Sequence, residues 1–196
     1  MTYESSSLVA TTAIGQTTGS LITTRHPKIT LNWEGVVGDL HAGYQRSAEA
    51  RVPWYVRGTP MRNERQLTVV SEEELSATAQ ALGIPVLQPE WIGANVMVRG
   101  IPDLTFLFPT TRLVFSSGAV LVVINENRPC RSAADSVQLH NPTSTGIAQN
   151  FVKHAHQRRG VIACVEIPGD ISPNDEVTVD APKNWAWMTR LTRSKL

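Results

Sequence analysis

The stretch Ala119-Val120-Leu121-Val122-Val123-Ile124-Asn125-Glu126-Asn127-Arg128-Pro129-Cys130-Arg131 joins an apolar, valine-rich run to a polar loop that contains proline. A short apolar run of this kind is typical of a buried β-strand. The strand would deliver the Cys130 thiol into a loop between the guanidinium groups of Arg128 and Arg131. Because positive charge favours the thiolate, which is both a nucleophile and a metal ligand, the stretch predicts a β scaffold that presents a reactive cysteine.

The second cysteine, Cys164, lies in the aliphatic run 161–165 and is predicted to belong to the core, where a free cysteine behaves as a small hydrophobe. Two cysteines in such different settings do not indicate a disulfide framework. The chain shows neither a basic N-terminal leader pattern nor an apolar stretch of about 18 residues. We therefore expect a cytoplasmic protein that has no membrane partner.

Length and charge limit the possible function classes. The 196 residues suit a single domain, with a core at about 7–180 and a C-terminal tail at 181–196 that carries Trp185 and Trp187. The 18 basic and 17 acidic residues leave a net charge of +1, so no nucleic-acid partner is expected. Fourteen of the 18 basic residues are arginines, whose planar fork suits phosphate or carboxylate recognition. A phosphorylated small ligand is therefore a plausible partner.

The pattern of β-branched runs and turn residues predicts a mostly β fold with a few helices, an α+β class. A long arginine-bearing loop is expected at 43–64, and a closing, hairpin-like pair of strands after Gly160. Strands are expected at 8–14, 21–24, 67–70, 95–98, 105–108, 112–115, 120–124, 161–167 and 176–179, and helices at 72–82 and about 145–157.

The clearest helix signal begins at Ser71, which forms a capping-box pattern with Glu74, and Gly83 supplies the stop. Glu72, Glu73 and Glu74 favour the positive end of the helix dipole. First-turn carboxylates of this kind are mostly solvated, so we expect no metal or acid–base role for them.

Three polar clusters interrupt the β pattern. The glycine-rich segment 35–43 carries Asp39 and His41, a carboxylate and an imidazole in one turn, although such a segment is more often only a turn. Arg65 shares a strand face with Leu67, which suits an anion site or, equally, a structural salt bridge. Asn95 follows Gly93 and can either cap a turn or donate to a ligand.

Taken in order, these elements resemble the MOSC family, named for the C-terminal domain of molybdenum-cofactor sulfurases. The resemblance rests on the order and spacing of Gly35-x-x-Gly38-Asp39-x-His41-Ala42-Gly43, Arg65, Gly93-x-Asn95, Pro129-Cys130 and the strand from Gly160. It covers about residues 7–180, and the cysteine characteristic of the family falls on Cys130.

The resemblance implies an irregular closed β-barrel of the MOSC type with a few peripheral helices, and a molybdenum cofactor of the molybdopterin type. It implies that Cys130 is a catalytic residue and the molybdenum ligand, with Asp39 and His41 as further catalytic candidates. The candidates for cofactor binding are Arg65, Asn95, Asn127, Arg128 and Arg131.

The sequence also departs from the family. Relatives often have Gly-Glu-Asn where this chain has Gly93-Ala94-Asn95, so that glutamate has no role here. The pyridoxal-phosphate-dependent domain of full-length sulfurases has no counterpart, and no segment of this sequence supports pyridoxal phosphate binding. With no ferredoxin-like cysteine cluster, electrons for a reduction would come from a separate protein.

Three hypotheses follow. The first is an oxidoreductase that reduces N-hydroxylated or similar small compounds. The second is a sulfur or cofactor carrier that uses a Cys130 persulfide and a separate sulfur-donor protein. The third is a non-catalytic β interaction module, in which replacing Cys130 by serine would change stability alone. The sequence does not specify an oligomeric state.

Overall fold

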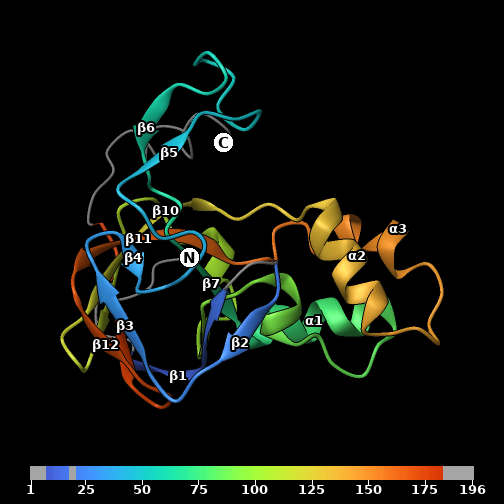
Figure 1. The fold of residues 1–196 in the computed structure, drawn as a ribbon. Helices are drawn as coiled ribbons and strands as arrows, with labels where there is room; N and C mark the ends of the chain where they lie inside the picture. Colours follow the sequence, from blue (N-terminus) through green and yellow to red (C-terminus); the bar gives the residue numbers. More distant parts are fainter. Residues whose placement is uncertain (1–7, 18–20, 183–196) are drawn as a thin grey trace, which may run out of the picture.

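The computed structural model describes residues 8–17 and 21–182, and its centre is a curved eight-stranded sheet (Figure 1). The sheet order is β13-β9-β10-β11-β7-β8-β1-β2. Because β13 also pairs with β1, the sheet closes into a barrel, and β2 extends from the far half of β1. The strands are β1 (Leu8–Thr17), β2 (Thr23–Arg25), β7 (Leu67–Ser71), β8 (Val96–Arg99), β9 (Arg112–Phe115), β10 (Val120–Glu126), β11 (Val161–Ile167) and β13 (Glu176–Asp180).

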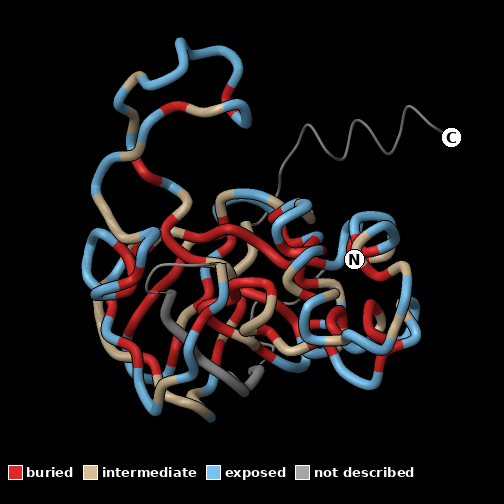
Figure 2. The backbone as a smooth tube through the Cα atoms, turned by 45° about the vertical axis from the view of Figure 1, so that its right-hand side comes forward, coloured by how far each residue is buried: buried red, intermediate tan, exposed pale blue. Residues whose placement is uncertain are grey.

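Two smaller sheets accompany the barrel. One joins β12 (Gly169–Ile171), β3 (Ile29–Asn32) and β4 (Gly35–Val36). The other is a hairpin of β5 (Gln45–Ser47) and β6 (Pro60–Arg62), which projects away from the barrel (Figure 1). Figure 2 shows that most of this projection is exposed, in contrast to the barrel.

The helices gather at one side of the barrel and form a second core with the outer face of its wall (Figure 1). They are α1 (Glu72–Leu82), α2 (Arg131–Leu139) and α3 (Ile147–His154), with short 3-10 helices at Pro89–Ile92 and Leu104–Phe106. Phe151 of α3 is fully buried in this second core. No helix in the described residues is long and apolar enough to cross a membrane.

The sequence prediction of a mostly β, closed barrel with peripheral helices is confirmed. The helix at 72–82 is confirmed at both ends, with Ser71 Oγ accepting from the Glu74 backbone N–H and Gly83 ending the helix in the left-handed conformation. The buried strands β7, β10 and β11 also lie where the apolar runs predicted them.

Several local predictions were wrong. Residues 104–106 form a 3-10 helix rather than a strand, because the Glu74 carboxylate accepts from the Thr105 backbone N–H and so replaces a ladder partner. The loop at 43–64 contains the β5–β6 hairpin, and β1 continues through Gly15 without a break. Helix α2 was not predicted, because the small residues Ala133 and Ala134 provide much of its buried face.

The predicted closing pair is also absent in the described residues. Strand β11 pairs with β10 and β7, whereas β13 pairs with β9 and β1. The connecting turn contains β12, which pairs with β3 and carries the chain to the other side of the barrel. The prediction failed because strands that are close in the sequence were assumed to pair with each other. The predicted packing of Trp185 and Trp187 lies outside the described residues.

Cys164 is half-buried rather than in the core. Its neighbours Ala163 and Val165 point into the barrel core, and the alternation of a strand places Cys164 on the opposite face. Burial still raises the pKa of the Cys164 thiol. The aliphatic neighbours in the sequence therefore did not reveal which face the thiol occupies.

Glu74 is buried, contrary to the expectation that all three first-turn glutamates are solvated. Its carboxylate accepts hydrogen bonds from the backbone N–H and hydroxyl of Thr105, both at 2.8 Å. The Thr105 hydroxyl oxygen in turn accepts from the Gly160 N–H at 2.8 Å. Through Thr105, the Glu74 carboxyl therefore connects α1 to the residue before β11 instead of facing water. The same burial raises the pKa of Glu74 to about 7.

Candidate functional site

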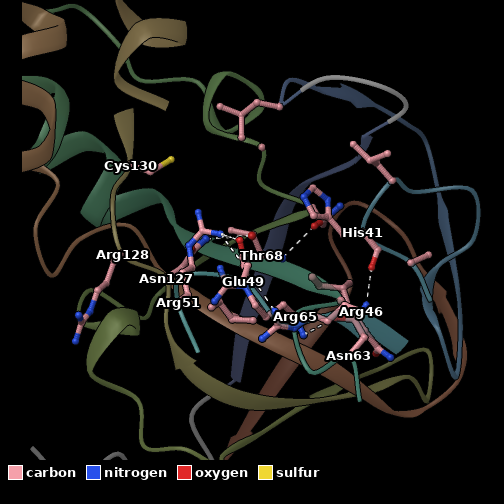
Figure 3. Close-up of a pocket in the computed structure, with 18 of the residues that line it drawn as sticks. His41, Arg46, Glu49, Arg51, Asn63, Arg65, Thr68, Asn127, Arg128 and Cys130 are labelled. Atoms are coloured by element: carbon pink, nitrogen blue, oxygen red, sulfur yellow. Dashed lines mark hydrogen bonds and ion pairs between the residues drawn. The ribbon is translucent and has the colours of Figure 1, made fainter. Parts of the chain in front are cut away.

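A cavity of about 400 Å³ opens at one end of the barrel, between the barrel wall, the projecting hairpin and the start of α2 (Figure 3). This volume lies within the range of small-ligand sites in proteins. Cys130 and His41 line the cavity, and Glu49 is the single acidic residue among the lining residues. Arginines supply the other charged groups, namely Arg46, Arg51, Arg65, Arg128 and Arg159.

A buried carboxylate organises the glycine-rich end of the cavity. Asp39 Oδ1 accepts from the His41 backbone N–H at 2.7 Å and lies 3.0 Å from His41 Nδ1. Asp39 Oδ2 accepts from Asn95 Nδ2 at 2.8 Å, while Asn95 Oδ1 accepts from the Thr68 backbone N–H at 2.9 Å. Asn95 therefore joins the 35–43 turn to strand β7.

This arrangement sets the tautomer of His41. An ionised carboxylate can only accept, so His41 Nδ1 carries the hydrogen that faces Asp39. In neutral His41, Nε2 then presents a lone pair and can accept a proton from a bound ligand. The ring is about half exposed, with 48% of the side-chain surface accessible, so a ligand in the cavity can reach it.

Two asparagines brace the loops around the cavity. Asn63 Nδ2 donates to the carbonyl oxygens of His41 and Gly43, and Asn63 Oδ1 accepts from the Arg65 N–H. Asn127 Nδ2 donates to the Thr68 hydroxyl at 3.1 Å. Both asparagines are buried, so they hold the loops in place rather than adapting to solvent.

Arg159 is a buried guanidinium at the cavity wall. Its Nη2 donates to the Ile92 carbonyl at 2.6 Å, but Nε and Nη1 have no hydrogen-bond partner among the described residues. Burial lowers the pKa of Arg159 to about 10, so the group remains charged at neutral pH. A buried charge with unsatisfied donors is costly to a protein unless a ligand satisfies it.

The hairpin and the segment between it and β7 contribute a second group of arginines. Glu49 lies 2.8 Å from Arg51 Nη1 and 3.6 Å from Arg46 Nη1. Burial, followed by the positive charges of Arg51 and Arg46, lowers the pKa of Arg65. Arg65 makes no ion pair with any residue that the structure describes. The cavity thus concentrates positive charge and suits an anionic ligand.

Cys130 occupies the position immediately before the first residue of α2. Its backbone carbonyl accepts from the Ala134 N–H, and its side chain makes no capping hydrogen bond. Asn127 N–H, bonded to the Gly160 carbonyl at 2.9 Å, fixes the loop that leads to it. The thiol therefore lies at the positive end of a helix, beside a cavity lined by arginines.

Comparison with known proteins identifies the family of the chain. The model of the MOSC domain matches residues 38–178. The chain belongs to the MOSC domain family. A Bacillus subtilis (strain 168) MOSC relative, named "Putative metal-sulfur cluster biosynthesis proteins YuaD", is 41% identical over 162 residues, covering 83% of this chain and 84% of that protein.

Comparison with solved structures agrees with this family assignment. The crystal structure of YuaD from Bacillus subtilis matches with a TM-score of 0.87 and 38% identity, covering 90% of this chain and 98% of that chain. YiiM from Escherichia coli matches with a TM-score of 0.56 and 16% identity, covering 88% of this chain and 70% of that one, which shows the fold alone. The MOSC fold is therefore shared beyond recognisable sequence similarity.

The structure brings most of the site residues that were predicted from the sequence to one cavity. His41, Arg65, Asn95, Asn127, Arg128 and Cys130 all line it, and Asp39 lies beneath it through its bonds to His41 and Asn95.

Two of the predicted arginines are peripheral. Arg128 is 87% exposed and points away from the arginines around Glu49 (Figure 3). Arg131 does not line the cavity and instead pairs with Asp135 on the surface of α2, at 2.8 Å. The two guanidiniums adjacent to Cys130 in the sequence are therefore not its main charged surroundings.

Sequence reasoning missed Arg159, Arg46 and Arg51. Arg159 lies in the pair Arg158-Arg159 after α3, where charged residues look like a solvated helix end. Its only distinctive signal is the following Gly160, which a close backbone approach requires. Arg46 and Arg51 were noted as part of a loop but not as cavity residues.

The MOSC family is associated with molybdenum-cofactor binding, and the residues present fit such a group. Arg159 offers two unpartnered buried nitrogens and Arg46 one, which suits the phosphate of a pterin cofactor. Cys130 offers a soft sulfur ligand at the same cavity. Clusters of three or more His, Cys, Asp or Glu side chains able to hold a metal are absent from the described part of the chain.

Proposed function

We propose that this MOSC protein binds a molybdopterin-type cofactor in the arginine-lined cavity, with Cys130 as the molybdenum ligand. The observation that carries the proposal is the buried Arg159, which lines the same cavity as Cys130 and has two side-chain nitrogens without a hydrogen-bond partner among the described residues. An anionic ligand would satisfy these donors and remove the cost of burying them.

The residues that line or support the cavity would have different roles. Arg65 and Arg159 would hold the anionic part of the cofactor, and Asn95 and Asn127 would keep the cavity wall in place. The cofactor would supply a redox-active metal centre. His41 Nε2, oriented by Asp39, would exchange a proton with a substrate in the cavity.

We infer that the reaction is the reduction of N-hydroxylated or similar small compounds. Reduction of an N–OH group to N–H consumes two electrons and two protons and releases water. His41 can relay protons, but the chain has no ferredoxin-like cysteine cluster to supply electrons. The electrons would therefore come from a separate donor protein.

The first test measures molybdenum by elemental analysis in protein purified anaerobically from cells that make the cofactor. We expect near-stoichiometric metal in the wild type and a loss of metal in Cys130→Ser. Cys164→Ser is the matched control, because that thiol lies outside the cavity, and it should retain the metal. Equal, negligible metal in all three proteins would contradict the proposal.

A sulfur carrier is the second candidate, favoured by the name of the relative YuaD, which refers to metal–sulfur cluster biosynthesis. In this reaction the Cys130 thiolate attacks the outer sulfur of a donor persulfide, the donor leaves as a thiolate, and Cys130 becomes the persulfide. Incubation with a persulfide donor followed by alkylation and mass spectrometry should then show one added sulfur atom on Cys130. Without metal and without added sulfur, a non-catalytic β module would remain.

A further inference from the structure

Glu49 brings a negative charge into a cavity that otherwise collects positive charge. Both of its carboxylate oxygens lie 2.8 Å from Arg51 Nη1, and Oε1 lies 3.6 Å from Arg46 Nη1 (Figure 3). The other charged lining residues are all arginines. An anionic ligand that uses these arginines would therefore meet a carboxylate already bound to them.

The ionisation of Glu49 follows from these neighbours. Burial acts to raise the pKa of Glu49, but the hydrogen bond and charge of Arg51, with the charges of Arg46 and Arg65, lower it overall. Glu49 is thus ionised at neutral pH and repels a second anion at the same guanidiniums. Arg65, in the segment before β7, is among the charges that lower the pKa of Glu49, so Glu49 also opposes an anion that would bind Arg65.

The contact with Arg51 is one that a ligand can break. The side chains of Glu49 and Arg51 remain 41% and 55% exposed, and an exposed ion pair contributes only about 0–1 kcal/mol. Both residues lie on the projecting hairpin segment, most of which is exposed (Figure 2). By contrast, Arg159 has two donors without a partner and no ion pair among the residues that the structure describes.

We propose that Glu49 is a built-in competitor, a carboxylate that an anionic ligand must displace from Arg46 and Arg51 to engage the whole arginine cluster. The inference rests on the proposed anionic ligand and concerns how the cavity selects it. A phosphate dianion can outcompete a carboxylate for guanidinium groups, whereas a ligand with one carboxylate has no such advantage. Glu49 thereby favours phosphorylated ligands.

The test is calorimetric titration of the full chain with inorganic phosphate at constant ionic strength. We expect Glu49→Gln to bind phosphate roughly fivefold to tenfold more tightly than the wild type, because a nearby like charge is removed from a partly solvated site. Glu64→Gln is the matched control. It removes the same charge beside Arg65 in the sequence, but Glu64 does not line the cavity, so its affinity should stay within about twofold of the wild type.

Arg65→Gln identifies the titrated site and should weaken phosphate binding in both the wild type and the Glu49→Gln protein. Weaker or unchanged binding in Glu49→Gln overturns the proposal, since Glu49 would then organise the arginines or be irrelevant to them. Absence of phosphate binding in both proteins, or binding unaffected by Arg65→Gln, overturns it as well. Molybdenum content in wild type and Cys130→Ser is measured independently, so failure here is distinguishable from failure of the proposed function.

Discussion

The barrel wall and the projecting hairpin contribute to the same cavity but are stabilised in different ways. On the wall, Asn95 is buried and hydrogen-bonded, and Arg159 is buried with its orientation set by a backbone carbonyl. On the hairpin, Glu49 and Arg51 form a partly exposed ion pair. The difference indicates that the wall fixes the geometry of the site, while the hairpin can adjust to what occupies it.

Two glycines of positive φ give the largest expected contrast. A Cβ at Gly160 would lie 2.0 Å from the Val69 carbonyl oxygen, whereas one at Gly58, on the hairpin loop, would meet nothing within 4 Å. We expect Gly160→Ala to destabilise the protein by about 3–5 kcal/mol, since it combines steric overlap with backbone strain. Gly58→Ala should cost only the strain, about 1 kcal/mol. Chemical denaturation measures both, and equal losses would contradict the comparison.

The pH dependence of the unfolding free energy tests Glu74, whose carboxyl on α1 is connected through Thr105 to Gly160 at the barrel wall. The pKa of Glu74 is about 7 in the folded protein, against 4.5 for an exposed glutamate, so the folded state binds an extra proton between these two values. Stability is then greatest below about pH 4.5 for this group and falls as pH rises toward 7, by up to about 3 kcal/mol. Urea unfolding across this range should show the fall in the wild type, and Glu74→Gln should flatten it. An unchanged slope in the variant would rule out Glu74 as its source.

Removing the hydrogen bonds of Asn95 at the barrel wall should lower the free energy of unfolding by a somewhat smaller amount. Asn95→Ala removes one hydrogen bond from the buried Asp39 carboxylate and one from the Thr68 backbone N–H. We expect a loss of about 2–3 kcal/mol, because buried polar groups lose their partners. Glu49→Gln on the hairpin should change unfolding free energy by less than about 1 kcal/mol. Similar losses in the two variants would mean that the hairpin is as rigid as the wall.

The smallest expected effect concerns ligand affinity at the two kinds of arginine. Arg159→Gln should weaken phosphate binding about tenfold, since a buried charge-assisted hydrogen bond contributes more than an exposed one. Arg128→Gln, at a side chain that is 87% exposed, should change affinity by less than about twofold. Titration at two salt concentrations measures both, and a stronger effect from Arg128 would reverse the assignment of the wall as the anchoring half.

Much of the architecture could be read from local patterns. The valine-rich run before Cys130 predicted β10, and the Ser71, Glu74 and Gly83 signals predicted α1, because periodicity and capping act over a few residues. The 3-10 helix at Leu104–Phe106 was missed for the opposite reason. Its geometry depends on Glu74, which is distant in the sequence and supplies the partner for Thr105.

The candidate site divides in the same way. The sequence by itself determined which residue types were available: one thiol in a polar loop, an Asp39–His41 turn and a basic set made mostly of arginine. The tertiary structure alone decided which of these meet, bringing Arg46, Arg51 and Arg159 to the cavity and leaving Arg131 outside it. The physical reason is that barrel closure and burial act between residues far apart in the chain, so the charge surrounding a thiol is set by the fold and not by its neighbours in sequence.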